Sequence, residues 1–188
     1  LSRGLGDVYK RQPAERAQIG ADGTDFMRSH TGLCVMPEYS TKWQMWGGVT
    51  PETIEKAFAE TPDAKAVLLV SPTYYGLCSD LQAIAEICHC HNAALLVDEA
   101  HGSHLYFSEQ LPLGALESGA DACAQSIHKT AGSFTQSSFL SLGSGRLDEA
   151  RVAANLQMVQ STSPSYLLMA SLDAARRGMA LHGKERME

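Results

Sequence analysis

The sequence predicts an α/β fold in which a mostly parallel sheet carries helices on both faces. Apolar, β-branched runs alternate with segments of helical periodicity between residues 60 and 140. The runs at 65–71 (KAVLLVS) and 93–98 (AALLVD) start about 28 residues apart with a helical segment between them, which is the size of a βαβ unit. Each run is apolar on both faces, and such strands belong to a sheet that is covered on both sides.

Further strand and helix signals flank this unit. Residues 120–126 (ADACAQS) are expected to form a third strand and residues 137–142 (SSFLSL) a fourth. A helix is expected over 51–60, where a proline occupies the first turn behind a threonine cap. The segment 79–91 (SDLQAIAEICHCH) places four apolar residues at helical spacing behind a cap at Ser79 or Asp80.

Two helices are expected near the end of the sequence, over 146–160 and 165–183, the second ending near Gly183. The second contains an apolar stripe, LLMASL (167–172), which the periodicity predicts to be a buried helix face. No internal repeat, low-complexity tract or long linker interrupts the pattern, so one domain is expected.

Composition excludes several classes of function. The sequence has 188 residues, 44% of them hydrophobic, and a formal net charge of −6, which argues against a nucleic-acid partner. No apolar run approaches the ~20 residues of a membrane helix. The five cysteines are odd in number and irregular in spacing, which is typical of reduced thiols in a cytoplasmic protein rather than of a disulfide framework.

The first twelve residues (LSRGLGDVYKRQ) show neither a signal-peptide core nor a secondary-structure period. They resemble a translated adapter, so residues 1–12 are interpreted as a non-native tail. The sequence begins without Met and ends within a pattern (GKERME). Residues 13–188 are therefore interpreted as a fragment of a longer protein.

Polar residues follow three of the predicted strands. The segments are SPTYYG (71–76), DEAHGSH (98–104) and SIHKT (126–130). Because the carboxyl ends of parallel strands lie at one edge of a sheet and mark its ligand side, these three segments are expected to converge.

The DEAH string at 98–101 is compatible with two chemistries. In an ATPase it would hold a metal ion, but that function requires a G-x-x-x-x-G-K-[ST] loop, which this sequence does not contain. The alternative is a pyridoxal phosphate site. Its ring nitrogen requires a buried carboxylate, for which Asp98 at a strand end is placed, and its aldehyde requires a lysine, for which Lys129 is placed one strand further on. Ser126 and His128, beside that lysine, are candidate phosphate donors.

Longer stretches resemble a known family. SPTYYGLCSDL, LLVDEAHGSHLYF, GADACAQSIHKTAGSFTQSSFL and STSPSYLLMASLDAARR are similar to the major domain of the Orn/Lys/Arg decarboxylases, which are fold-type I pyridoxal-phosphate-dependent enzymes. The resemblance covers roughly four fifths of the sequence from Pro37 onward. QSIHKTAGSFTQSS is its most specific part, because it resembles the family's cofactor-attachment signature.

The resemblance implies a decarboxylase of arginine, lysine or ornithine that produces a polyamine or its precursor and forms at least a homodimer. It implies that Lys129 forms the Schiff base, Asp98 pairs with the ring nitrogen, His101 lies near the ring, and Ser126 and His128 bind the phosphate. The family's upstream phosphate loop, its ring-stacking histidine and its small C-terminal domain have no match in this sequence. The resemblance therefore implies that residues 13–188 are a partial pyridoxal-phosphate-binding major domain without its N-terminal part and without the small C-terminal domain. Another fold-type I enzyme (an aminotransferase or α-oxoamine synthase) and an inactive fragment therefore remain as alternatives.

Two histidine-containing motifs could suggest a metal site. In CHCH (88–91), adjacent residues of a helix point about 100° apart and cannot converge on one ion. The pair His101 and His104 has H-x-x-H spacing, but no further ligand cluster accompanies it. Packing cysteines and solvated histidines are expected, and no metal ligands are predicted.

Overall fold

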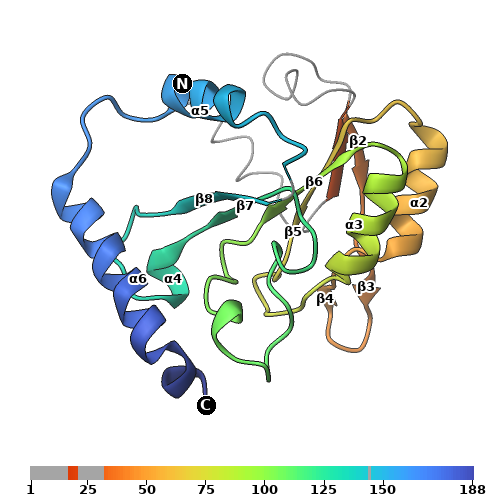
Figure 1. The fold of residues 1–188 in the computed structure, drawn as a ribbon. Helices are drawn as coiled ribbons and strands as arrows, with labels where there is room; N and C mark the ends of the chain where they lie inside the picture. The colour runs from red at the N-terminus through yellow and green to blue at the C-terminus, as the bar shows by residue number, and fades with distance from the viewer. Residues whose placement is uncertain (1–16, 21–31, 144) are drawn as a thin grey trace.

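The computed structural model describes residues 17–20, 32–143 and 145–188 of the chain. The interpreted tail at residues 1–12 lies outside these ranges. Figure 1 shows the arrangement of the elements. The strands are β1 (Ala17–Gly20), β2 (Gly32–Val35), β3 (Tyr39–Ser40), β4 (Met45–Trp46), β5 (Ala66–Val70), β6 (Ala94–Asp98), β7 (Ala122–Gln125) and β8 (Phe139–Leu142). The helices are α2 (Pro51–Glu60), α3 (Leu81–Cys90), the 3-10 turn η1 (Leu105–Phe107), α4 (Ile127–Thr130), α5 (Glu149–Val159) and α6 (Tyr166–Met187).

The main sheet has six strands in the order β2-β1-β5-β6-β7-β8. At its centre β5, β6 and β7 pair in parallel. β1 runs antiparallel to both of its neighbours, so β2 has the direction of the three central strands, while β8 pairs antiparallel with β7. Four of the six strands thus point the same way, and the predicted α/β fold with a mostly parallel sheet is confirmed. β8 is the strand predicted over 137–142, now with its direction known.

The two helices predicted around β5 are present with the expected caps. α2 covers the predicted range, and the Thr50 hydroxyl accepts a hydrogen bond from the Thr53 amide (3.3 Å). α3 begins after Asp80, whose carboxylate accepts from the amide of Ala83 (3.1 Å). A polar side chain that satisfies a free amide of the first turn fixes where a helix starts, which is why these two starts could be read from the sequence.

The core lies between the sheet and these two helices, which Figure 1 shows together on one side of the sheet. Along β5 and β6 every second side chain is buried, and Val67, Leu69, Leu95 and Val97 point to the helices. The intervening side chains of both strands point to the opposite face and are half-buried or exposed. Within the described residues, therefore, one face of the central strands is well covered and the other is only partly covered.

The C-terminal helices differ from the prediction in two respects. α6 does not end near Gly183 but continues to Met187, because glycine lowers helix stability without preventing a helix. The stripe at 167–172 was predicted to be buried, and this prediction is wrong for much of it. Leu167 is 75% exposed and Met169 is 53% exposed. The helix instead packs through Ala175, Met179 and Gly183.

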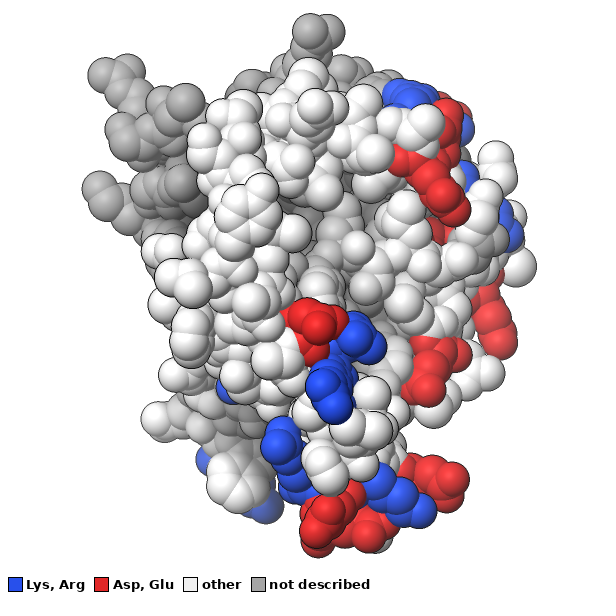
Figure 2. Space-filling model, turned by 60° about the vertical axis from the view of Figure 1, so that its left-hand side comes forward, with Lys and Arg blue, Asp and Glu red and all other residues white. Residues whose placement is uncertain are grey.

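Figure 2, turned so that the side bearing α6 comes forward, shows a broad surface without Lys, Arg, Asp or Glu next to a charged lower part. Among the described residues, no helix is long and apolar enough to cross a membrane.

Candidate functional site

The three polar segments predicted to converge do lie at one edge of the sheet. β5, β6 and β7 are adjacent and parallel, with Val70 opposite Asp98 and Asp98 opposite Ala124. The ladder continues past the strand ends, where the amide of Ser71 donates to the carbonyl of Asp98 (3.1 Å) and the amide of Glu99 donates to the carbonyl of Ala124 (2.9 Å). The carboxyl ends of the three strands are thereby held in register, as expected for the ligand side of a parallel sheet.

Asp98 is the last residue of β6, and its side chain is exposed. One carboxylate oxygen accepts a hydrogen bond from the amide of Ala100 (3.1 Å). The sequence led us to expect a buried carboxylate here, and that expectation is wrong for the side chain of Asp98 in this structure. The cause is the strand alternation of period two, which turns Val97 and Glu99 toward the core and Asp98 toward the open face.

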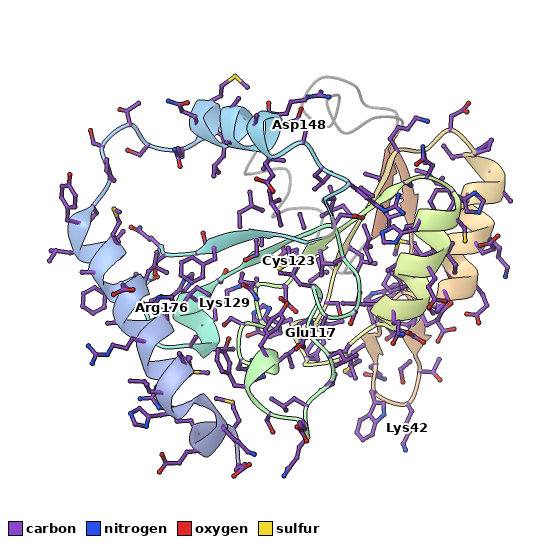
Figure 3. The ribbon with its side chains drawn as sticks, viewed as in Figure 1. Lys42, Glu117, Cys123, Lys129, Asp148 and Arg176 are labelled. Carbon is purple, nitrogen blue, oxygen red and sulfur yellow. The ribbon has the colours of Figure 1, made fainter. Side chains whose placement is uncertain are left out.

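Lys129 and His101 lie on the same edge as Asp98. Lys129 is an exposed residue of the short helix α4, directly beyond β7 (Figure 3). Burial lowers the pKa of His101, the positive charge of Lys129 lowers this pKa further, and the negative charge of Asp98 opposes both. Both charges therefore act on the same imidazole. The structure places these three predicted residues at the same edge of the sheet.

The His101 ring is set in place by an aromatic neighbour. The ring of Tyr74, from the segment after β5, meets it edge to face with 5.6 Å between the centroids. The Nδ1 atom of His101 is buried and has no hydrogen-bond partner among the described residues. Because buried polar atoms are nearly always satisfied, this nitrogen is a candidate for contact with a ligand.

Ser126 and His128 lie at the start of α4, the first as its cap residue and the second within its first turn. Ser126 occupies the cap position, but its hydroxyl makes no cap hydrogen bond. His128 donates from Nδ1 to the carbonyl of Ser137 (3.0 Å), which fixes the ring. The hydroxyls of Thr130 and Ser103 lie 2.5 Å apart and tie α4 to the segment after β6. The predicted phosphate donors thus lie on a turn anchored to both neighbouring segments.

Sequence reasoning did not identify Glu99, which is fully buried (0% exposed). Its carboxylate accepts hydrogen bonds from the Tyr106 hydroxyl (2.8 Å), the Gln125 side-chain amide (2.8 Å) and the Ala115 backbone amide (2.7 Å). The available signal was the alternation, since Glu99 continues the inward positions of Leu95 and Val97. Our interpretation instead treated DEAH as a single polar string.

The two candidate metal motifs have other contacts. In CHCH, His89 pairs with Asp121 (3.1 Å) and His91 stacks on Phe58 with 4.3 Å between ring centroids. Of the cysteines in this motif, Cys88 is buried and Cys90 is exposed, so the second does not pack as predicted. Within the described ranges no group of three or more His, Cys, Asp or Glu side chains is arranged to hold a metal ion.

The donor set of this edge fits pyridoxal phosphate. An amine (Lys129) and a carboxylate (Asp98) act on one imidazole, and the unpartnered Nδ1 of that imidazole is a polar atom that a ligand would satisfy. A hydroxyl and a second imidazole stand on the adjoining turn. These are the groups that the aldehyde, the ring nitrogen and the phosphate of that cofactor require.

Comparison with solved structures identifies the class of fold. The constitutive lysine decarboxylase of E. coli superimposes with a TM-score of 0.60 at 21% identity, over 81% of this chain and 23% of that one. An aminotransferase from Mesorhizobium loti that acts on pyridoxamine and pyruvate gives a TM-score of 0.55 at 16% identity, over 72% of this chain and 38% of that one. At these identities the likeness shows the fold alone, which is that of the fold-type I pyridoxal-phosphate enzymes.

The sequence comparisons narrow the class to a family. Residues 32–188 match the model of the Orn/Lys/Arg decarboxylase major domain. The arginine decarboxylase of Halalkalibacterium halodurans is 45% identical over 82% of this chain, and that of Bacillus subtilis is 44% identical over 83%. The chain belongs to the Orn/Lys/Arg decarboxylase family. It spans about a third (32%) of the length of each of these two relatives.

Proposed function

We propose that the chain carries the cofactor-binding edge of a pyridoxal-phosphate-dependent decarboxylase that acts on a basic amino acid: arginine, lysine or ornithine. The observation that carries the proposal is the meeting of Lys129, Asp98 and His101 at the carboxyl edge of parallel strands. Membership of the family and the arginine decarboxylases among its relatives support the reaction and the substrate class.

Each residue has a task in this proposal. When bound, the cofactor supplies an electron sink for the carbon from which the carboxylate leaves. Lys129 would hold the aldehyde carbon of the cofactor through its amine and, when not so engaged, could move a proton. The carboxylate of Asp98 pairs with the ring nitrogen and keeps it protonated, because an adjacent negative charge favours the cationic form. Ser126 and His128 donate to the phosphate.

In this proposal His101 lies near the cofactor ring as a neutral imidazole. Because its pKa is lowered by burial and by Lys129, the imidazole is uncharged near neutral pH and can both donate and accept a hydrogen bond. Its edge-to-face contact with Tyr74 would keep the imidazole in place beside a bound cofactor. A charged imidazole here would instead repel the protonated ring nitrogen that Asp98 is proposed to stabilise.

The wider setting is also part of the proposal. A decarboxylase of these substrates yields diamines or a polyamine precursor. We expect a homo-oligomer of at least two chains, in which the exposed Thr135 and Gln136 approach a neighbouring subunit's cofactor. All five cysteines are unpaired, which favours a reducing compartment such as the cytoplasm.

The test is to trap the cofactor on its lysine. The purified chain is incubated with pyridoxal phosphate, reduced with borohydride, digested and mapped by mass spectrometry. We expect one modified peptide, labelled at Lys129, and loss of that label in Lys129→Ala. The control is Lys42→Ala, a lysine that lies over the exposed ring of Trp43, which should label like the wild type. A label spread over many lysines would contradict the proposal.

The reaction class is tested separately. Release of carbon dioxide from carboxyl-labelled arginine, lysine or ornithine would distinguish a decarboxylase from an aminotransferase or an α-oxoamine synthase of the same fold. We expect Asp98→Ala to lower this release at least tenfold, about 1.4 kcal/mol, while some Lys129 labelling persists. Unchanged release in that variant would refute the role of Asp98.

A further inference from the structure

Glu99 is the buried carboxylate of this edge. It has no exposed surface, and among the described residues no Lys, Arg or His forms an ion pair with it. A charge in such a place is tolerated only when hydrogen bonds replace its lost hydration. Glu99 has three such bonds, two to Oε2 from Tyr106 and Gln125 and one to Oε1 from the Ala115 amide.

The three donors come from different segments of the candidate site. Tyr106 belongs to η1, in the segment that follows β6 and contains His101. Gln125 is the last residue of β7 and directly precedes Ser126 and the turn that bears Lys129. Ala115 belongs to the loop that leads from η1 to β7. A single side chain therefore joins the ends of β6 and β7 to the loop between them.

Gly102 lies close to the carbon atoms of the same side chain and to Pro72, which follows β5. A Cβ added at Gly102 would lie 2.5 Å from Cγ of Glu99 and 2.7 Å from Cδ of Pro72, so Gly102 packs tightly between these two residues. Likewise, the ring of Tyr106 leaves no room for a Cβ at Gly114. The segments after β5, β6 and β7 are all packed or hydrogen-bonded around Glu99.

We propose that Glu99 is a positioning residue, which fixes the direction of Asp98 and the distance from Asp98 to Lys129 when pyridoxal phosphate binds. This inference rests on the proposed function. The alternation of the strand provides the mechanism: with Glu99 locked into the core, Asp98 must point to the opposite face. The bond from Gln125 then sets the start of the turn that carries Lys129.

The hydrogen-bond inventory explains why a carboxylate is needed at this position. The Ala115 amide can only donate. The Tyr106 oxygen accepts from the amide of Leu116 (3.2 Å), and because burial raises the pKa of Tyr106 the hydroxyl keeps its proton and donates to Glu99. A glutamine offers one acceptor oxygen in place of two. In Glu99→Gln, the side-chain NH₂ group would therefore face another hydrogen-bond donor, while the side-chain volume would hardly change.

The experiment compares Glu99→Gln with Glu117→Gln in the purified 188-residue chain. Glu117 is an exposed carboxylate of the same loop, labelled in Figure 3, whose side chain accepts only from the Gly114 amide (3.2 Å) among the described residues. Two quantities are measured: the pyridoxal phosphate concentration for half-maximal Lys129 labelling, and the pH midpoint of the visible absorbance of the bound cofactor. Thermal melting without cofactor reports on folding.

We expect Glu99→Gln to raise the half-maximal concentration about tenfold, the effect of one misplaced hydrogen bond to a charged group, and to shift the pH midpoint. Glu117→Gln should change neither. The effect of Glu99→Gln should shrink to less than about twofold in an Asp98→Asn background, because residues that act through one another are not additive. Tyr106→Phe removes one donor and keeps the ring, so it should raise the half-maximal concentration by a smaller factor. If Glu99→Gln does not fold, Tyr106→Phe is used in its place.

The outcomes separate this inference from the proposed function. If the wild-type chain is not labelled at Lys129, the proposed function and the role of Glu99 are both refuted. If it is labelled but Glu99→Gln and Tyr106→Phe behave like the wild type, the role of Glu99 falls and the proposed function stands. An equal effect of Glu99→Gln with and without Asp98→Asn would also overturn the inference, because a purely structural role predicts that result.

Discussion

Helices α2 and α3 bury their apolar faces against the sheet, whereas α5 and α6 leave most of theirs uncovered. In the first pair Ile54, Phe58 and Ile84 are almost completely buried. In the second pair α5 has no buried side chain, and α6, although twice as long as α3, has three buried residues. In Figure 1 α2 and α3 lie together on the right, whereas α5 lies at the top and α6 on the left.

Local signals do not account for this difference. All four helices begin with a side-chain cap: Asp148 caps α5 (2.9 Å to the Ala150 amide) and Ser165 caps α6 (3.5 Å to the Leu168 amide), as Asp80 caps α3. Both regions also contain large apolar residues at helical spacing. The two pairs of helices differ in the surface that they contact. The apolar side chains of α2 and α3 pack against the main sheet, whereas most of those of α5 and α6 do not. Caps and propensity therefore determine where a helix lies along the chain, and tertiary packing determines whether it contributes to stability.

The largest expected effect comes from a matched pair of leucine substitutions. Leu69 of β5 is 1% exposed and lies in the main core, while Leu167 of α6 is 75% exposed. Leu69→Ala should lower the free energy of unfolding by about 2 to 5 kcal/mol, because it leaves a cavity. Leu167→Ala should change it by less than about 0.5 kcal/mol. Urea unfolding followed by circular dichroism measures both values.

This comparison would fail if Leu167→Ala were as destabilising as Leu69→Ala. Such a result would mean that the apolar surface of α6 is covered in solution, and it would be accompanied by a dependence on protein concentration if a second chain covers it.

Two aspartates give the next largest effect. Asp121 is buried and accepts from the Leu95 amide (2.7 Å) and from His89 Nε2 (3.1 Å), thereby joining β6 to α3. Asp173 is an exposed residue of α6 paired with Arg176 (2.7 Å) one turn away. Asp121→Asn should cost about 1 to 3 kcal/mol of unfolding free energy, and Asp173→Asn less than about 0.5 kcal/mol. Equal values in the same unfolding assay would show that burial of the carboxylate does not matter.

Much of the fold could be predicted because its signals are local or periodic. β5, β6 and β7 were found from apolar runs, and the start of α3 from a cap at Ser79 or Asp80, since these features depend on neighbours in the chain. The burial of LLMASL could not be predicted. An apolar stripe at helical spacing is ordinarily a core face, and only the three-dimensional arrangement reveals that Leu167 meets no neighbouring layer.

The candidate site, like the fold, has features that the sequence predicts and features that depend on three-dimensional packing. Residues at the ends of parallel strands must share an edge, so the meeting of Asp98, His101 and Lys129 followed from topology. Glu99 was missed because its donors, Tyr106 and Gln125, lie 7 and 26 residues away in the chain. A sequence pattern indicates that an inward-facing carboxylate needs partners, but it does not identify them.

The smallest expected effect is a dependence of stability on pH that arises at the site edge and not at α6. Burial lowers the pKa of His104, against a smaller opposing effect of Glu99, and burial with Lys129 lowers that of His101. The Nδ1 atoms of both are buried without a hydrogen-bond partner among the described residues. Protonation is therefore easier in the unfolded chain.

The sign of the pH effect follows from proton binding. Below the unfolded value of about 6.5 and above the lowered folded value, the unfolded chain binds more protons, so stability is present above about pH 6.5 and is lost as the pH falls. Thermal melting at about pH 7.5 and about pH 5.5 should show this loss in the wild type and a smaller loss in His101→Gln/His104→Gln. His182→Gln, at an exposed position of α6, should behave like the wild type. An undiminished loss in the double variant would assign the acid sensitivity to other groups, and the site edge would then be no more sensitive to protonation than the exposed helix.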